Sequence, residues 1–93
     1  ANRRIHILFA GLRRKPLADL LDELKDYDLT VTSFDFFEAL PLEDYPQHLE
    51  RSTDYRDWLT KAESANPDDL FVVTGSLYFI SEVRNYLINE KKA

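Results

Sequence analysis

The sequence lacks cysteine and methionine altogether and contains only two glycines among its 93 residues. Without cysteine, the chain can form no disulfide and offers no thiolate ligand to a metal ion. Because methionine is missing even at position 1, we expect the chain to be a fragment of a larger protein. Gly11 and Gly75 each follow an apolar run that predicts a strand, which is where open α/β sheets bind ligands.

Positive charge is also scarce, since 12 Lys and Arg stand against 17 Asp and Glu, giving a net charge of −5. Neutralising the phosphates of a nucleic acid needs clustered basic residues, so we expect no nucleic-acid partner. No apolar run approaches the ~20 residues of a membrane-spanning helix, and no signal-peptide pattern is present. We therefore expect a soluble, cytoplasmic protein that has no membrane partner.

The remaining composition is that of a globular protein, with 44% hydrophobic and 13% aromatic residues. A chain of this length forms one small domain, which buries roughly 60–65% of its unfolded surface around a single core. We assign residues 1–93 to one domain, because the sequence shows neither an internal repeat nor a low-complexity stretch.

Hydrophobic periodicity predicts three strands and three helices in alternation. The nearly continuous apolar run over residues 5–10 is typical of a strand buried on both faces, with His6 as a strand-end side chain rather than a ligand. Segment 35–46 is acidic, aromatic and interrupted by two prolines, which favours irregular structure with at most short helical turns. The other predicted elements are a helix from Pro16 to Asp26-Tyr27-Asp28, strands over 29–34 and 70–73, and helices over 53–65 and from about Ser76.

Each predicted helix carries an apolar stripe that should pack against the sheet. Alternation of strands and helices implies a mostly parallel sheet, right-handed crossovers and helices on both faces. We expect Thr53 or Ser52 to cap the second helix. The stripes are Leu17, Leu20, Leu21 and Leu24 in the first helix, Tyr55, Trp58, Leu59 and Ala62 in the second, and Phe79 or Ile80 with Val83 and Leu87 in the third.

The first candidate site is the turn Thr74-Gly75-Ser76 between a buried strand and a helix. The N-terminus of a helix carries a partial positive charge and unsatisfied N–H donors, so it can hold a carboxylate or phosphate. The same residues equally suit a plain helix cap in a tight turn. No Gly-Lys-Ser/Thr motif is present, which excludes a phosphate-binding P-loop.

The basic loop Arg13-Arg14-Lys15 is the second candidate, because in a parallel sheet it emerges at the same edge as the Thr74 turn. Together they could hold a small dicarboxylate, although an ordinary solvated loop explains the charges too. Four acidic residues could bind Mg²⁺ or act in acid–base chemistry, but their irregular spacing favours a solvated loop. They are Asp35, Glu38, Glu43 and Asp44, and His48 stands alone with no partner motif.

Three blocks of the sequence resemble one enzyme family. Residues 73–84, VTGSLYFISEVR, closely resemble the C-terminal signature of folylpolyglutamate synthase and the bifunctional dihydrofolate synthase, which belong to the Mur ligase superfamily. Residues 7–16, ILFAGLRRKP, and residues 32–36, TSFDF, are similar to two earlier blocks of the same domain. The resemblance implies a three-layer, Rossmann-like C-terminal domain that closes over the ATP site and brings in the incoming amino acid.

The family joins L-glutamate to folate through an acyl phosphate made with ATP and Mg²⁺. The resemblance implies that Ser76, with Thr74, Gly75 and Tyr78, meets the glutamate, and that Lys15 with Arg14 pairs with a glutamate carboxylate. Arg14 departs from the family, which often has Asp there, and the family's Asp-Gly-Ala-His-Asn block is absent. We therefore expect a fragment without the domain's first strand and helix, which is inactive alone and docks onto its own central ATPase domain, where ATP and Mg²⁺ mainly bind.

Two further expectations follow. A sheet without its first strand leaves an open strand edge, which favours self-association at high concentration. The alternative to a ligase fragment is a non-catalytic α/β binding module, which would dock a partner through a surface containing Phe36, Phe37 and Tyr45.

Overall fold

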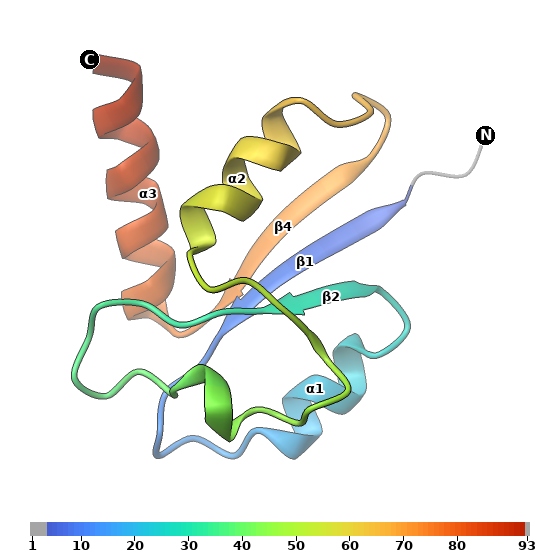
Figure 1. The fold of residues 1–93 in the computed structure, drawn as a ribbon, viewed down its shortest axis with the longest axis vertical. Helices are drawn as coiled ribbons and strands as arrows, with labels where there is room; N and C mark the ends of the chain where they lie inside the picture. Colours follow the sequence, from blue (N-terminus) through green and yellow to red (C-terminus); the bar gives the residue numbers. More distant parts are fainter. Residues whose placement is uncertain (1–3, 93) are drawn as a thin grey trace.

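The computed structural model describes residues 4–92, which form four strands and three α-helices (Figure 1). The first strand is followed by a crossover helix, a second strand and a long irregular segment that contains one 3-10 turn. A short third strand, a helix, a fourth strand and a long terminal helix complete the chain. The bounds are β1 Ile5–Ala10, α1 Ala18–Leu24, β2 Asp28–Val31, η1 Leu42–Asp44, β3 Glu50–Arg51, α2 Tyr55–Glu63, β4 Leu70–Gly75 and α3 Leu77–Lys92.

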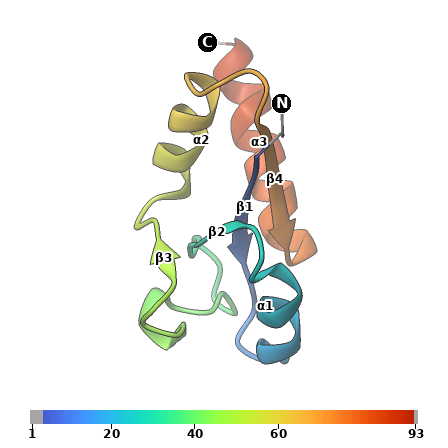
Figure 2. The same cartoon turned by 90° about the vertical axis from the view of Figure 1, so that its right-hand side faces the viewer.

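The four strands form one parallel sheet in the order β3-β2-β1-β4, which confirms the predicted α/β class. Figure 2 shows β3 and β4 at opposite sides of the sheet, with β1 and β2 between them. Ile7 pairs with Leu29 of β2 on one side and with Val72 of β4 on the other. Since all strands run the same way, the loops that follow β1 and β4 leave the sheet at the same edge.

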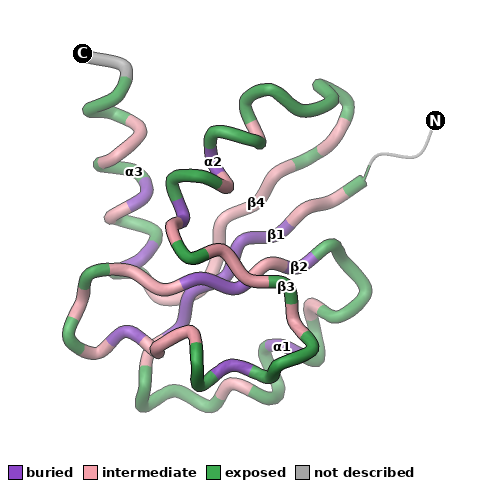
Figure 3. The backbone as a smooth tube through the Cα atoms, in the orientation of Figure 1, coloured by how far each residue is buried: buried purple, intermediate pink, exposed green. Residues whose placement is uncertain are grey.

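Alternation along β1 divides the interior into two layers, one on each face of the sheet. Ile7 and Phe9 pack with Leu21 of α1, whereas Leu8 and Ala10 pack on the opposite face. That opposite layer is completed by α2 and α3, so the predicted helices on both faces are confirmed. Figure 3 shows the buried stretch along β1 and β2, flanked by exposed outer helix surfaces. Phe79 and Leu8 are fully buried, and each such side chain contributes about 1.5–3 kcal/mol through burial.

The apolar stripe of α1 is narrower than predicted. Leu21 is buried, and Leu17 and Leu24 pack at the margin of its layer. Leu20, by contrast, remains 43% exposed. Adjacent helical residues are about 100° apart, so Leu20 and Leu21 cannot both face the sheet. Leu20 instead lies near Gly11 and Leu12, at the end of the sheet from which the β1 loop emerges.

Helix α2 begins at Tyr55, one residue later than a cap at Thr53 would place its start. Asp54, rather than Thr53 or Ser52, caps it, because the Asp54 carboxylate accepts a hydrogen bond of 2.9 Å from the Arg56 N–H. The Ser52 hydroxyl donates to the Asp54 carbonyl instead, at 2.7 Å. Tyr55 and Leu59 are buried, as the periodicity predicted. Of the alternatives offered for α3, Phe79 faces the core and Ile80 lies 36% exposed.

The segment between β2 and α2 contains the one strand that the sequence pattern missed. Strand β2 ends at Val31, three residues before the predicted end. The Thr32 N–H still donates to the Phe9 carbonyl at 2.9 Å, and the Thr32 hydroxyl donates to the Ser52 carbonyl at 2.8 Å. Among residues 4–92, no helix combines the length and apolarity needed to cross a bilayer.

Candidate functional site

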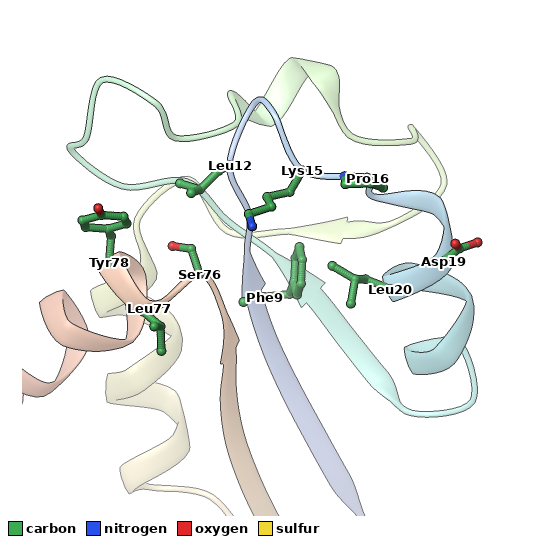
Figure 4. Close-up of a pocket in the computed structure, with 11 residues that line it drawn as sticks. Phe9, Leu12, Lys15, Pro16, Asp19, Leu20, Ser76, Leu77 and Tyr78 are labelled. Atoms are coloured by element: carbon green, nitrogen blue, oxygen red, sulfur yellow. The ribbon is translucent and has the colours of Figure 1, made fainter.

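A cavity of about 560 Å³ opens at the carboxyl ends of β1 and β4 (Figure 4). Its walls come from both layers: the β1 loop and α1 form one side, and the start of α3 forms the other. Parallel α/β sheets bind ligands at this edge. The lining residues are Phe9, Gly11, Leu12, Lys15, Pro16, Asp19, Leu20, Gly75, Ser76, Leu77 and Tyr78.

The pairing of β4 with β1 continues to the last residue of both strands, where the chain turns into α3. Gly75 pairs with Ala10 in the parallel register and has a φ of 123°, which L side chains rarely adopt. The next N–H, that of Ser76, donates to the Ala10 carbonyl at 3.1 Å. This bond ends the β1–β4 pairing, and α3 therefore starts directly above the end of the sheet.

Ser76 caps the helix that it precedes. Its hydroxyl accepts a hydrogen bond of 3.1 Å from the Phe79 N–H, and its carbonyl accepts one of 3.1 Å from the Ile80 N–H. The capping alternative raised from the sequence is therefore realised. The hydroxyl keeps its own proton to donate, and the first N–H groups of a helix have no partner within the helix. The cap and an anion site at this position are thus compatible.

Hydrogen bonds to residues 38–40 and to Tyr45 fix the loop that follows β1. The Arg13 N–H donates to the Glu38 carbonyl at 2.8 Å, and the Leu40 N–H donates to the Gly11 carbonyl at 3.0 Å. The Gly11 N–H donates to the buried hydroxyl of Tyr45 at 2.9 Å. Three hydrogen bonds therefore fix the loop that carries the basic residues.

Lys15 and Arg14 occupy different surroundings despite being neighbours in sequence. In Figure 4 the Lys15 side chain runs back from its loop toward the strand ends, with its nitrogen between Ser76 and Phe9 in that view. The Arg14 side chain is 87% exposed and lies 3.9 Å from the Glu38 carboxylate, outside the cavity lining. Thr74 does not line the cavity either. The structure thus brings together Lys15, Gly75, Ser76 and Tyr78 from the predicted set.

Three leucines in the cavity wall were not singled out from the sequence as site residues: Leu12, Leu20 and Leu77. Leu77 is 80% exposed although it opens a helix beside a half-buried turn. A leucine directly after a predicted cap, outside the apolar stripe of its helix, is a signal that sequence inspection could have used. Leu20 is a similar case. Its neighbour Leu21 faces the sheet, so Leu20 has to face elsewhere and could have been expected in a ligand-binding wall.

The aromatic surface proposed for a binding module is partly wrong. Tyr45 is 2% exposed, and its hydroxyl accepts the Gly11 N–H, so Tyr45 belongs to the core. Burial raises the pKa of the Tyr45 hydroxyl. Phe37 is 81% exposed, and Phe36 stacks on Tyr78 with ring centroids 4.6 Å apart. The surface therefore consists of Phe36, Phe37 and Tyr78 and adjoins the cavity.

The ionisable side chains elsewhere serve local structure. His6 bonds through its two ring nitrogens to Asp28 and Asp69, consistent with a strand-end role. Within residues 4–92, no group of three or more His, Cys, Asp or Glu side chains is arranged to hold a metal ion. A polar cavity near the start of α2 contains Tyr55, whose pKa is raised to about 12 by burial and by a hydrogen bond with Glu82.

Comparison with known proteins gives one informative match. The dihydrofolate synthase/folylpolyglutamate synthase of Bacillus subtilis strain 168 is 31% identical over 102 aligned positions. The alignment takes in 94% of this chain, which spans only 22% of the relative. No family profile matches the chain, and no solved structure matches it. The resemblance stated from the sequence is confirmed, since nearly the whole chain is similar to one region of that enzyme.

Proposed function

We propose that this chain is part of the C-terminal domain of a cytoplasmic, ATP-dependent folylpolyglutamate synthase. Its task there is to position L-glutamate so that the amine meets an activated folate carboxyl group. The observation that carries this proposal is the meeting of Lys15 and the capped start of α3 in one cavity. Similarity to the Bacillus subtilis enzyme over 94% of the chain supplies the reaction class.

The chemistry of this site suits a carboxylate. The Lys15 ammonium supplies a positive charge, the Ser76 hydroxyl a donor, and the start of α3 unpaired N–H groups. Hydrogen bonds to charged groups contribute about 1.5–3 kcal/mol each. Holding the amino acid in a reactive orientation lowers the barrier for joining two substrates by about 7 kcal/mol or more. In this proposal Arg14 and Thr74 remain outside the cavity lining and contribute less.

ATP and Mg²⁺ do not fit the residues of this chain. The described residues 4–92 hold no carboxylate or histidine cluster for a metal, and the sequence has no Gly-Lys-Ser/Thr loop. We therefore propose that the central ATPase domain binds both. On this proposal the isolated chain has no ligase activity.

Steady-state kinetics of the enzyme that contains this chain test the proposal. Lys15→Ala should raise the KM for L-glutamate about 10- to 100-fold, because it removes one charge-assisted contact. Ser76→Asp separates the two roles of Ser76, since Asp is an equally good cap but repels a carboxylate. This variant should keep its stability and lose glutamate binding.

Lys61→Ala, on the exposed end of α2, is a matched control and should leave the KM unchanged. An unchanged glutamate KM in both Lys15→Ala and Ser76→Asp would contradict the site assignment.

The interaction-module alternative keeps one supporting observation, the 81% exposure of Phe37 beside the Phe36–Tyr78 stack. The coding sequence upstream of residue 1 discriminates the two functions. An encoded phosphate-binding loop and an Asp-Gly-Ala-His-Asn segment favour the ligase, whereas a start codon adjacent to residue 1 favours the module.

A further inference from the structure

The two walls of the cavity are joined at its base, where β1 and β4 end side by side. Gly75 pairs with Ala10, and the Ser76 N–H donates to the Ala10 carbonyl at 3.1 Å. Beyond this contact the walls separate, since one belongs to the α1 layer and α3 packs on the opposite face of the sheet. A connection at the base alone leaves the distance between Lys15 and the start of α3 free to vary, so a second contact is needed to fix it.

Residues 36–40 make that second contact, and on one side they hold the loop after β1. Two backbone hydrogen bonds join residues 38–40 to this loop, and Leu12 forms an antiparallel bridge with Ala39. The Lys15 N–H donates to the Leu12 carbonyl at 3.3 Å, which closes the loop into a turn. The backbone of Lys15 is thereby tied to the segment that follows β2.

On the other side, the same segment contacts the start of α3 through Phe36. In Figure 1 the chain after β2 passes the start of α3 on its way to η1. The Phe36 ring stacks on Tyr78 at 4.6 Å with an interplanar angle of 21°, and on Phe34 at 5.7 Å. Phe34 in turn contacts the fully buried Phe79 at 5.2 Å. Because aromatic pairs prefer a few defined geometries, this stack fixes the segment against the first turn of α3.

The Phe36 side chain has no other evident structural task. Within residues 4–92 it belongs to neither apolar layer of the sheet, and it does not line the cavity. The Ala39 N–H donates to the Phe36 carbonyl at 2.9 Å, so the ring and the loop-binding residues form one compact turn. The neighbouring Phe37 ring is 81% exposed. The stack on Tyr78 therefore distinguishes Phe36 from the aromatic residue beside it.

We infer that Phe36 is a positioning residue, which holds the Lys15 loop and the start of α3 at one separation through its stack on Tyr78. The separation follows from contacts within this chain, whereas its effect on glutamate rests on the proposed function. A carboxylate that binds Lys15 and Ser76 at once needs both groups at a fixed distance, because hydrogen bonds weaken when their geometry is lost. A site held in this way loses less conformational freedom when its ligand binds.

Distances between two spin labels, measured by pulsed electron paramagnetic resonance, test the separation directly. The 93-residue chain lacks cysteine, so Arg14→Cys on the loop and Arg84→Cys on α3 accept labels at these two positions alone. Both positions are exposed and lie outside the cavity lining. We expect a narrow distance distribution in the labelled chain and one about twice as wide after Phe36→Ala, because a loop that loses a contact moves over a larger range.

Three further variants separate the ring from its surroundings. Phe36→Tyr keeps the ring and should keep the narrow distribution. Phe36→Leu removes the ring but retains most of the apolar volume, so it should broaden the distribution with a smaller loss of stability. Phe37→Ala is the matched control and should leave the width unchanged. An unchanged width in both Phe36→Ala and Phe36→Leu overturns the inference, and so does a broadening that Phe36→Tyr or Phe37→Ala shares.

Steady-state kinetics of the enzyme that contains this chain show whether the fixed separation serves glutamate. Lys15→Ala should raise the KM for L-glutamate by a smaller factor in the Phe36→Ala background than in the wild type, by about threefold or more. In the Phe37→Ala background the factor should equal that of the wild type. A merely structural role of Phe36 would lower stability and leave the factor unchanged.

The outcomes of the kinetic experiment distinguish this inference from the proposed function. Equal Lys15→Ala factors in the wild type and in Phe36→Ala overturn the positioning role, while the proposed function stands if Lys15→Ala raises the KM in both. If Lys15→Ala has no effect in either background, the proposed function fails. The label distances then still decide whether Phe36 fixes the two walls.

Discussion

Gly75 approaches the carbonyl of Ala10 so closely that a Cβ at position 75 would lie 2.1 Å from the Ala10 oxygen. Two strands and the start of a helix meet at this contact, and the Ser76 N–H bonds to the same oxygen. Gly75 thus ends the pairing of β4 with β1 and also positions the start of α3, which forms one wall of the cavity.

Gly75→Ala should therefore destabilise the fold by about 3 kcal/mol or more, since it adds a steric clash to a strained positive φ. Chemical denaturation measures this loss. Gly11→Ala is the control: its Cβ would meet the Phe9 ring at 3.1 Å, a side chain that can shift, so a smaller loss is expected. Equal losses at the two positions would contradict the argument.

Tyr45→Phe tests the support of the basic loop. It removes the acceptor of the Gly11 N–H and leaves a buried donor unpaired, which costs about 1–3 kcal/mol. We expect faster amide exchange at Gly11 together with that loss of stability. Tyr27→Phe, at a tyrosine that is 44% exposed, should change neither quantity. If Tyr45→Phe matches Tyr27→Phe, the hydrogen bond does not support the loop.

The link of His6 to Asp28 and Asp69 makes stability depend on pH. The hydrogen bond to Asp69 is the main cause of the raised pKa of His6, and Asp28 adds to it. A histidine whose folded pKa exceeds its unfolded value of about 6.5 stabilises the fold fully below pH 6.5. This contribution disappears as the pH rises through the folded pKa.

The stability difference between wild type and His6→Asn should accordingly shrink as the pH rises from about 6 to well above the folded pKa of His6. Urea denaturation at a series of pH values gives this difference. His48→Asn, at an exposed histidine in the β2–β3 connection, supplies the comparison curve. A difference that grows with pH would reverse the proposed sign.

The sequence predicted those parts of the fold that a single strong hydrophobic pattern determines. The apolar run of β1 and the alternation of strands and helices predicted the parallel sheet, and with it the shared edge of the Lys15 loop and the Ser76 turn. The sequence pattern did not predict strand β3, because a strand of two residues shows no periodicity. The cap Asp54 was not predicted, because three residues that can cap a helix stand side by side, and only the structure shows that the Arg56 N–H bonds to the Asp54 carboxylate.

The free edge of β4 leads us to expect self-association of the chain. Leu70 and Ser76 donate toward β1, so by alternation the backbone groups of Phe71 and Val73 face outward. Within residues 4–92 β4 pairs with β1 alone, and Leu70–Gly75 contains no charge or proline that would protect the edge.

We therefore expect concentration-dependent dimerisation in sedimentation experiments. Leu70→Lys should weaken it, because Leu70 is 42% exposed and a lysine on an edge strand opposes pairing. Thr60→Lys on α2 adds the same charge away from this edge and should leave association unchanged. A wild-type chain that stays monomeric into the millimolar range would disprove the expectation.

The alternation of β1 has a mechanical consequence. One wall of the cavity belongs to the α1 layer and the other to the α3 layer, and these layers share no helix. A ligand that contacts both Lys15 and Leu77 links the layers on the two faces of the sheet. Ligand binding at this site should then stabilise both layers, so that the backbone amides of α1 and α3 become protected from hydrogen exchange together.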